Sequence, residues 1–395
     1  MEKVNVCIIG GGAAGITAAI AAAREGESVI ILERLQRVGK KILATGNGRC
    51  NITNAYIVDE NYHGGQSFAS EILNNFTYYE TLSFFESMGI VCCEGDEGKM
   101  YPASLQATSV LDLLRVEMDR LGIKIETEFF VKDIAKEKGI FKISSGDGNI
   151  FAENVIIACG GYAAPQFGTD GNMFPLIKML GHRVSAFYPA LVQLKTENTP
   201  KALKGVKHFC TAHLYIDGKK VKSEYGEVLF TEYGLSGPPV FNLSREASVA
   251  VSKGRNTEIS LELLADSFSE VLKMLENRKK LLPHLEGENF LNSVINKRIG
   301  FEITKRCKNL KEIASELKNY KHKVCGTMGF KNAQVTAGGV LCDEISSDTL
   351  MSKKVNGLYF AGEVIDVDGD CGGFNLQFAW SSGYIAGKSA ARRNV

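Results

Sequence analysis

The first 34 residues place the strongest constraint on the fold. The stretch VNVCIIGGGAAGITAAIAAAREGESVIILER combines a β-branched run, a glycine turn, an alanine-rich run and a second apolar run that ends at Glu33. This order predicts a strand, a helix and a parallel strand. Gly10, Gly12 and Gly15 occupy the G-x-G-x-x-G positions, where glycine permits a tight turn, a close pyrophosphate and close helix packing. Glu33 lies near the spacing at which a carboxylate binds ribose hydroxyls, so the segment predicts a dinucleotide-binding domain.

The composition is that of an ordinary folded protein. With 395 residues, the chain is long enough for two domains or for one domain with a large insertion. The 46 Lys and Arg residues nearly balance the 45 Asp and Glu residues, so we expect a small-molecule substrate and no nucleic-acid partner. The charge balance says nothing of the oligomeric state.

The cysteines and the apolar runs bear on the cellular compartment. The ten cysteines are scattered and show no CxxC spacing, which favours free thiols over a disulfide framework. The first strand-like run begins at Val4, and no run of about 18 apolar residues follows. We therefore expect a cytoplasmic protein without a membrane segment. The six histidines lack metal-ligand spacing, so we expect no metal site.

Two later apolar runs end in glycine, at 154–161 (NVIIACGG) and 356–364 (NGLYFAGEV). Each is expected to bring the carboxyl end of a strand to the ligand-binding edge of an α/β sheet. The stretch DVDGDCGGFN that follows has two interpretations. Its alternating aspartates could bind calcium, but an EF-hand loop counted from Asp366 would need glycine and glutamate where Cys371 and Gln377 stand. Alternatively, Gly372 to Asn375 start a helix whose amides suit the electron-rich pyrimidine edge of a flavin.

The middle of the chain has a different pattern of apolar and polar residues. Residues 209–234 alternate as antiparallel strands do, and Asp217-Gly218 is a hairpin signal. Three amphipathic helices are then predicted, at 267–285, 289–307 and 310–321. We expect an α/β fold in which residues 1–187 and 333–395 form one domain. Residues 188–332 form an inserted substrate or cap domain, with strands over about 188–265 and helices over about 266–330.

Four segments carry a resemblance that spans nearly the whole chain. They are the opening glycine turn, GKKILATGNGRCNITN at 39–54, VLFTEYGLSGPPV at 228–240, and the run from QVTAGGV to GLYFAGEVIDVDGDCGGFNLQFAWSSG. Together they resemble the bacterial FAD-dependent flavoprotein family that includes 3-dehydro-bile-acid Δ4,6-reductase and aminoacetone oxidase. The resemblance implies FAD as cofactor and a Rossmann-like domain of the two-dinucleotide type. A nicotinamide, NAD(P)H, is expected only as a transient reductant, because no second G-x-G-x-x-G follows a strand.

The resemblance also implies a set of cofactor-binding residues. Gly10 to Gly15 would hold the pyrophosphate and Glu33 the ribose. Val131, in a strand, would meet the adenine through its backbone, and the segments near Lys41, Glu363 and Gly373 would hold the remainder of FAD. The complete set is Gly10, Gly12, Ala13, Ala14, Gly15, Glu33, Arg34, Lys41, Thr45, Gly46, Asn47, Gly48, Arg49, Cys50, Asn51, Val131, Ala158, Gly160, Gly362, Glu363, Gly373, Phe374, Asn375 and Leu376.

The candidate catalytic residues are fewer. Glu232 and Tyr233 could face the substrate as proton donor or anchor, or could belong to a surface loop. Glu232 stands where many family members carry histidine. Tyr101 could line the same cleft or serve in packing. Arg49 could bind a substrate carboxylate or a flavin phosphate, and Cys50 could take part in dithiol chemistry or simply be packed.

The resulting functional prediction is an FAD-dependent oxidoreductase that transfers two electrons as hydride through flavin N5. The resemblance points first to reduction of a conjugated C=C bond in a 3-oxo steroid such as a bile-acid intermediate. Aminoacetone oxidation by O2 is one alternative. A flavin-binding sensor or a tRNA-modifying flavoprotein is another.

Overall fold

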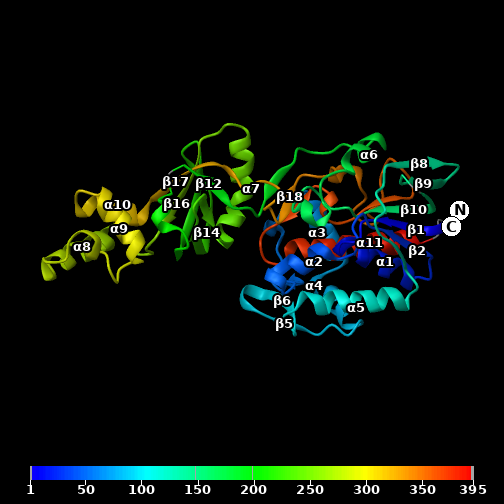
Figure 1. Ribbon diagram of the computed structural model, residues 1–395, viewed down its shortest axis with the longest axis horizontal. Helices are drawn as coiled ribbons and strands as arrows, with labels where there is room; N and C mark the ends of the chain where they lie inside the picture. Colours follow the sequence, from blue (N-terminus) through cyan, green and yellow to red (C-terminus); the bar gives the residue numbers. More distant parts are fainter. Residues whose placement is uncertain (1, 147, 198, 393–395) are drawn as a thin grey trace. The chain divides into compact units, whose positions relative to one another are not determined.

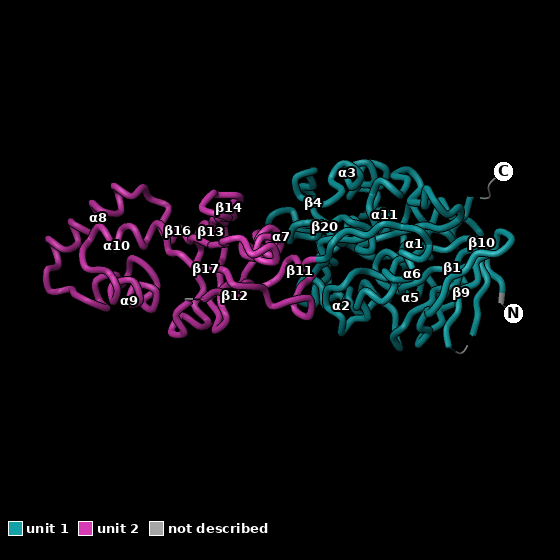
Figure 2. The backbone as a smooth tube through the Cα atoms, turned by 90° about the horizontal axis from the view of Figure 1, so that it is seen from above, with its two compact units in different colours: residues 1–187, 335–395 teal, residues 188–334 magenta. Residues whose placement is uncertain are grey.

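The structure, a computed structural model, describes residues 2–146, 148–197 and 199–392. It contains two compact units, which Figure 2 colours separately. Unit 1 comprises residues 1–187 and 335–395, and unit 2 comprises residues 188–334. Unit 1 is therefore built from both ends of the chain, and unit 2 is one continuous segment.

A seven-stranded sheet forms the centre of unit 1 (Figure 1). The strand order is β7–β2–β1–β10–β9–β8, and β19 pairs with the carboxyl-terminal half of β10. β7, β2, β1, β10 and β19 run parallel, whereas β9 and β8 add antiparallel strands at one edge. The bounds are β1 (Glu2–Ile9), β2 (Val29–Leu32), β7 (Lys124–Glu126), β8 (Asp133–Glu137), β9 (Ile140–Ser144), β10 (Asn149–Ile157) and β19 (Leu358–Phe360).

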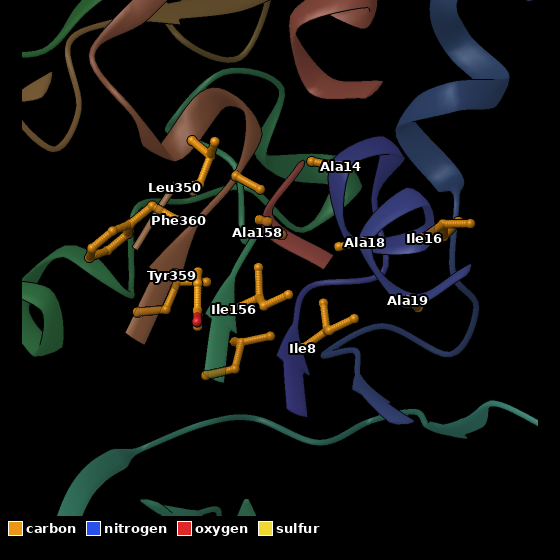
Figure 3. Close-up of a cluster of buried hydrophobic side chains, with 14 of the residues drawn as sticks. Ile8, Ala14, Ile16, Ala18, Ala19, Ile156, Ala158, Leu350, Tyr359 and Phe360 are labelled. Atoms are coloured by element: carbon orange, nitrogen blue, oxygen red, sulfur yellow. The ribbon is translucent and has the colours of Figure 1, made fainter. Parts of the chain in front are cut away.

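Two helices from opposite ends of the chain, α1 (Ala13–Arg24) and α11 (Phe374–Ala391), pack closely against each other. A Cβ on Gly383 would lie 2.4 Å from the carbonyl oxygen of Ala14, and one on Gly387 would lie 2.2 Å from that of Ala18. Only glycine permits this approach. Figure 3 shows part of the resulting core, with Ala14 and Ala18 beside Ile8 of the sheet.

The other elements of unit 1 surround this core. Two small sheets pair β3 with β6 and β5, and β20 with β4. The strands of these sheets are β3 (Thr53–Asn54), β4 (Tyr62–Gly64), β5 (Cys92–Glu94), β6 (Lys99–Pro102) and β20 (Val367–Gly369). Unit 1 also contains the short strand β18 (Val335–Ala337). The helices are α2 (Lys40–Ala44), α3 (Gln66–Asn75), α4 (Tyr78–Glu86), α5 (Ala107–Arg120) and α6 (Phe174–Met179).

Unit 2 contains a closed barrel of order β12–β15–β14–β13–β16–β17. The predicted hairpin at Asp217-Gly218 is confirmed, because both residues have positive φ and join β13 to β14. The strands are β11 (Tyr188–Ala190), β12 (Leu194–Thr196), β13 (Lys207–Ile216), β14 (Lys219–Phe230), β15 (Gly234–Ser236), β16 (Thr257–Glu262) and β17 (Tyr320–Thr327).

The helices of unit 2 depart from the predicted pattern in three places. α7 (Pro238–Ser252) lies in the range expected to hold strands, where two prolines at the helix start supply a fixed φ and packing on the barrel outweighs propensity. β17 occupies the end of the range expected to be helical. The helix expected over 289–307 begins only at Lys297, because the side chain of Asn296 caps it. The other helices are α8 (Phe268–Leu281), α9 (Lys297–Arg306) and α10 (Leu310–Lys318).

Candidate functional site

The glycine turn after β1 is crowded at two positions and open at a third. A Cβ on Gly10, whose φ is 109°, would lie 2.5 Å from the carbonyl oxygen of Ala158. A Cβ on Gly15 would lie 1.9 Å from the carbonyl oxygen of Gly10. Nothing lies within 4 Å of a Cβ placed on Gly12, which caps α1. Because the first amides of a helix have no intrahelical partners, the open space at Gly12 suits an anionic pyrophosphate.

The carboxylate of Glu33 is buried and braces this turn. Its Oε2 accepts a hydrogen bond from the amide of Gly11 at 2.9 Å, and its Oε1 accepts one from the amide of Leu35 at 2.8 Å. Each carboxylate oxygen keeps capacity for another donor, so a ribose hydroxyl can still bind. The structure thus gives Glu33 a local structural role in addition to the role expected from the sequence.

Arg34 follows Glu33 but directs its side chain to protein partners. Its Nη1 lies 2.5 Å from a carboxylate oxygen of Asp170, and its guanidinium lies 5.0 Å from the ring centroid of Phe130. These contacts hold the side chain beside the Glu33 segment. They give it no bond to the glycine turn.

Val131 is buried in a loop between β7 and β8, not in a strand as expected for an adenine contact. The cause is local, since Glu128 has a positive φ of 58° and breaks the extended conformation. The amide of Phe129 then donates to the carbonyl oxygen of Glu33 at 3.0 Å. The loop therefore still runs beside the end of β2.

The loop from Thr45 to Asn51 has an unusual backbone. Four of its residues have positive φ, and two of these, Asn47 and Cys50, are not glycine. Gly46 and Gly48 are the other two. Such conformations cost free energy and concentrate at ligand-binding and catalytic sites. The side-chain oxygen of Asn51, at the end of this loop, is buried and has no hydrogen-bond partner among the described residues, which leaves an acceptor for a ligand donor.

Arg49 and Tyr101 meet at the outer side of this loop. The guanidinium of Arg49 lies 4.9 Å from the ring centroid of Tyr101, and its Nε donates to the carbonyl oxygen of Gly46 at 3.3 Å. Tyr101 is 8% exposed and lies on β6. The ring of Tyr101 therefore supports the loop, which agrees with the packing interpretation of this residue.

This loop and the β3 residues that follow it, together the 45–54 loop, are joined to the start of α11. The Nδ2 of Asn54 donates to the carbonyl oxygen of Gly372 at 3.0 Å. A Cβ on Gly373 would lie 2.6 Å from the carbonyl oxygen of Thr53, so only glycine fits. The structure brings together the two most specific sequence motifs, GNGRCNITN and DGDCGGFNLQ.

The first turn of α11 faces this junction. Gly373, in the left-handed conformation, precedes the helix, and the first-turn amides belong to Phe374, Asn375 and Leu376. The side chain of Asn375 is hydrogen-bonded to the backbone of Gly369. It accepts from the amide of Gly369 and donates to the carbonyl oxygen of the same residue. Asn375 thus shapes the turn, while the helix amides remain the groups suited to an electron-rich ring edge.

Lys41 and Glu363 form a half-buried ion pair, with the Lys41 Nζ 2.6 Å from the Glu363 Oε2. The other oxygen of Glu363 accepts from the amide of Thr336 at 3.1 Å. Gly362, with a φ of 74°, places its Cα against the side chain of Ala14, where an added Cβ would lie 2.8 Å away. The segment after β19 therefore contacts the beginning of α1, next to Ala13, as a ligand bridging both segments requires.

Thr336 is a site residue that the sequence analysis did not single out. Its Oγ1 accepts hydrogen bonds from the amides of Tyr162 at 2.8 Å and Ala163 at 2.9 Å. These two residues follow Gly160, whose φ of 74° turns the chain after β10. The sequence signal for Thr336 was the QVTAGGV motif, which does not reveal that Thr336 binds the amides of Tyr162 and Ala163.

Burial affects two thiols near the site, those of Cys50 and Cys159. Burial raises the pKa of Cys50 to about 12, and burial raises that of Cys159 to about 12. A protonated, buried thiol is neither a nucleophile nor a good redox partner. The packed-cysteine interpretation of Cys50 is the one that the structure favours.

Glu232 and Tyr233 lie in unit 2, in the loop between β14 and β15. Glu232 is exposed, and its carboxylate lies 2.5 Å from the Nζ of Lys204. This hydrogen bond lowers the pKa of Glu232, so its carboxylate is ionised at neutral pH and is a poor proton donor. The backbone oxygen of Tyr233 accepts from Thr196 at 3.0 Å.

Of the three aspartates that suggested calcium, Asp368 lies on β20, and Asp366 and Asp370 flank that strand. Asp368 is buried on β20, which pairs with β4, and Asp370 accepts a contact from His63 Nε2 at 2.9 Å. Within residues 2–146, 148–197 and 199–392, no three His, Cys, Asp or Glu side chains gather in a way suited to a metal ion. None of the described helices combines the length and apolar character that a membrane crossing requires.

Comparison with known proteins identifies the family. The family model described as HI0933-like protein Rossmann domain matches residues 4–389. The chain belongs to this family. It is 40% identical to 3-dehydro-bile acid delta(4,6)-reductase of Clostridium scindens, over 98% of this chain and 99% of the relative. It is 31% identical to ribosomal RNA dihydrouridine synthase of Haemophilus influenzae, over 98% of each chain.

A solved structure shows the same fold. The 3-ketosteroid-Δ4-(5α)-dehydrogenase of Rhodococcus jostii RHA1 superposes with a TM-score of 0.53, at 14% identity, over 99% of this chain and 97% of that one. The predicted α/β Rossmann-like fold is confirmed, and so is the predicted enzyme class, an FAD-dependent oxidoreductase of the HI0933-like family.

Proposed function

We propose that this member of the HI0933-like family reduces a C=C bond conjugated to a carbonyl group, with a 3-oxo steroid as substrate. The observation that supports this most strongly is the junction between the 45–54 loop and the start of α11. It combines the first-turn amides of α11, which have no partner within the helix, a buried acceptor on Asn51 and glycines that no side chain can replace. The steroid substrate rests on the relative that is 40% identical.

The residues present fit FAD. The open space at Gly12 and the amides of α1 would bind the pyrophosphate, and Glu33 would bind the adenosine ribose. The Lys41–Glu363 pair and Gly362 would hold the ribityl chain. When bound, FAD would supply two electrons as hydride at N5, with NAD(P)H as the transient reductant.

The protein's own groups would set the polarity of the site. The first-turn amides of α11 would stabilise negative charge that develops at the adjacent ring edge. Neither of the two candidate acids is assigned as proton donor, because Glu232 in unit 2 is ionised and Tyr101 in unit 1 packs under Arg49. We therefore assign the proton to solvent.

The test uses purified protein loaded with FAD. A 3-oxo-4,6-diene steroid is incubated with NADH or NADPH without air, and the product is analysed by mass spectrometry. We expect a product with two additional hydrogens. Hydrogen peroxide release with aminoacetone in air, without reaction of the steroid, would instead establish the amine oxidase.

A second candidate substrate is uracil in RNA, whose C5=C6 bond is also conjugated to a carbonyl group. A relative at 31% identity is named ribosomal RNA dihydrouridine synthase. The chain-wide charge balance, which argued against nucleic acid, is divided unequally. Unit 2 has 24 Lys and Arg against 16 Asp and Glu, whereas unit 1 has 22 against 29. A basic unit is the electrostatic feature expected of a polyanion-binding protein.

These candidates are distinguished by product. Ribosomal RNA from cells lacking the gene is incubated with the FAD-loaded protein and a nicotinamide reductant. If dihydrouridine forms in the RNA and the steroid is not reduced in its own assay, the RNA substrate is favoured. Steroid reduction without dihydrouridine favours the first proposal.

A further inference from the structure

The outer surface of the β13–β14 hairpin in unit 2 exposes aromatic side chains. Phe209 is 62% exposed and Tyr225 is 73% exposed. Both point away from the barrel interior, because the alternate residues Cys210 and Val228 are buried. Large rings at such exposure on a regular sheet indicate a binding surface more than a packing role.

The two rings lie on one face and close together. In the hairpin register Phe209 pairs with Glu227, and Tyr225 pairs with Thr211. Phe209 and Tyr225 are therefore diagonal neighbours across adjacent strands, within reach of each other's rings. Val221, 50% exposed, extends the apolar area along the same strand.

Cations gather at the end of the hairpin. The amide of Asp217 donates to the carbonyl oxygen of Asn256 at 2.8 Å, so the hairpin turn lies against the 253–256 loop. This contact brings Lys219 and Lys220 near Lys253, and all three are exposed. Within the described parts of the chain, none of these three lysines forms an ion pair with a carboxylate.

We propose that this hairpin binds single-stranded RNA through the outward rings of Phe209 and Tyr225 and through Lys219, Lys220 and Lys253 at its turn end. Exposed rings on a sheet stack on unpaired bases, and lysines farther along the same hairpin can contact the phosphates of neighbouring nucleotides. The net positive charge of unit 2 makes a polyanion the complementary partner. The proposal rests on RNA as the second candidate substrate and identifies where unit 2 would hold it.

The test measures the affinity of the full-length, FAD-loaded protein for a uridine-rich single-stranded RNA oligonucleotide by fluorescence anisotropy. We expect Phe209→Ala and Tyr225→Ala each to weaken binding about tenfold, because each removes one stacking platform. Tyr225→Phe keeps the ring and is expected to bind as the wild type does. The matched control is Tyr79→Ala, which removes a tyrosine of similar exposure, 67%, from α4 of unit 1.

The contribution of the lysines is measured by the salt dependence of RNA binding. We expect the double variant Lys219→Ala/Lys220→Ala to reduce the slope of log affinity against log salt by about 1.4, because each lost phosphate contact on a single strand accounts for about 0.7. Circular dichroism and the bound flavin spectrum confirm that each variant is folded. Both substitutions lie on the protein surface, so neither removes a core contact.

Each other outcome overturns a defined part of the proposal. If the wild type binds RNA but the ring variants bind equally well, the face is wrong and the RNA substrate stands. If the wild type does not bind RNA at all, the hairpin surface and the RNA substrate are both wrong, and the proposal of steroid reduction is unaffected. If the ring variants change the oligomeric state in analytical ultracentrifugation and leave RNA binding unchanged, the face is an interface between two copies of this chain.

Discussion

The indole Nε1 of Trp380 donates a hydrogen bond to the carbonyl oxygen of Ile52 at 2.9 Å, across 328 positions of sequence. Trp380 is fully buried in α11, and its ring meets the edge of Phe85 with centroids 5.1 Å apart. This bond fixes the 45–54 loop against α11, the helix whose amino terminus we propose to bind the flavin. The site therefore depends on contacts between chain segments that fold together.

Trp380→Phe removes the donor and leaves the carbonyl group of Ile52 buried without it. We expect a loss of about 2 kcal/mol in the free energy of unfolding, from the lost bond and the smaller ring. Urea unfolding of the apoprotein measures it. Tyr384→Phe, in the same helix, is the matched control and should change stability by less than about 0.5 kcal/mol. Equal effects of the two substitutions would contradict the importance of the Trp380–Ile52 bond.

Gly12→Ala and Gly15→Ala separate cofactor binding from folding. A methyl group on Gly15 would collide with the carbonyl oxygen of Gly10 at 1.9 Å, so we expect a lower Tm already without FAD. A methyl group on Gly12 meets no protein atom within 4 Å, so the apoprotein should keep its Tm but lose FAD affinity at least about tenfold. Isothermal titration with FAD and calorimetry of the apoprotein provide the two readouts. Unchanged FAD affinity in Gly12→Ala would show that the pyrophosphate lies elsewhere.

The environment of Glu344, away from the candidate site, predicts that the folded protein loses stability at acid pH. Burial raises its pKa, but hydrogen bonds from Lys354 and Arg183 outweigh this, and the net effect lowers its pKa from 4.5 to about 2. A lowered folded-state pKa contributes stability above pH 4.5 that is lost as the pH falls toward 2. Glu344→Gln should therefore destabilise the protein at pH 7 by about 3 kcal/mol and flatten the acid limb of its stability curve. The exposed Asp348, changed to Asn, is the control that should leave the curve unchanged.

Glu232→Gln tests the candidate proton donor. Because the carboxylate is exposed, ionised and paired with Lys204, we expect kcat to change less than about twofold. Steady-state kinetics with the unsaturated substrate and NAD(P)H measure it. A fall of about a hundredfold or more, with a shifted pH profile, would restore an acid role for Glu232.

Local patterns were sufficient for part of the fold. The glycine positions 10, 12 and 15 and the flanking apolar runs follow from periodicity and turn chemistry, which operate within a few residues. The Asp217-Gly218 hairpin is likewise local, because both residues adopt positive φ easily.

The long-range partners could not be read from the sequence. Thr336 accepts hydrogen bonds from the amides of residues more than 170 positions away, and Trp380 donates one to Ile52. Neither hydrogen-bonding partnership has a local sequence signature. The helix α7 was missed because packing on the barrel decides its conformation against a mixed local propensity. The charge division between units was hidden by an almost neutral total.

The most direct test of the account is a single turnover. The FAD-loaded protein is reduced chemically without air, mixed with a 3-oxo-4,6-diene steroid or with uridine-containing RNA, and followed by its visible flavin absorbance. The account predicts that the absorbance of oxidised flavin returns in step with loss of one C=C bond per flavin, for one of these two substrates. A protein that takes up no FAD, or a reduced flavin that neither substrate reoxidises, would contradict it.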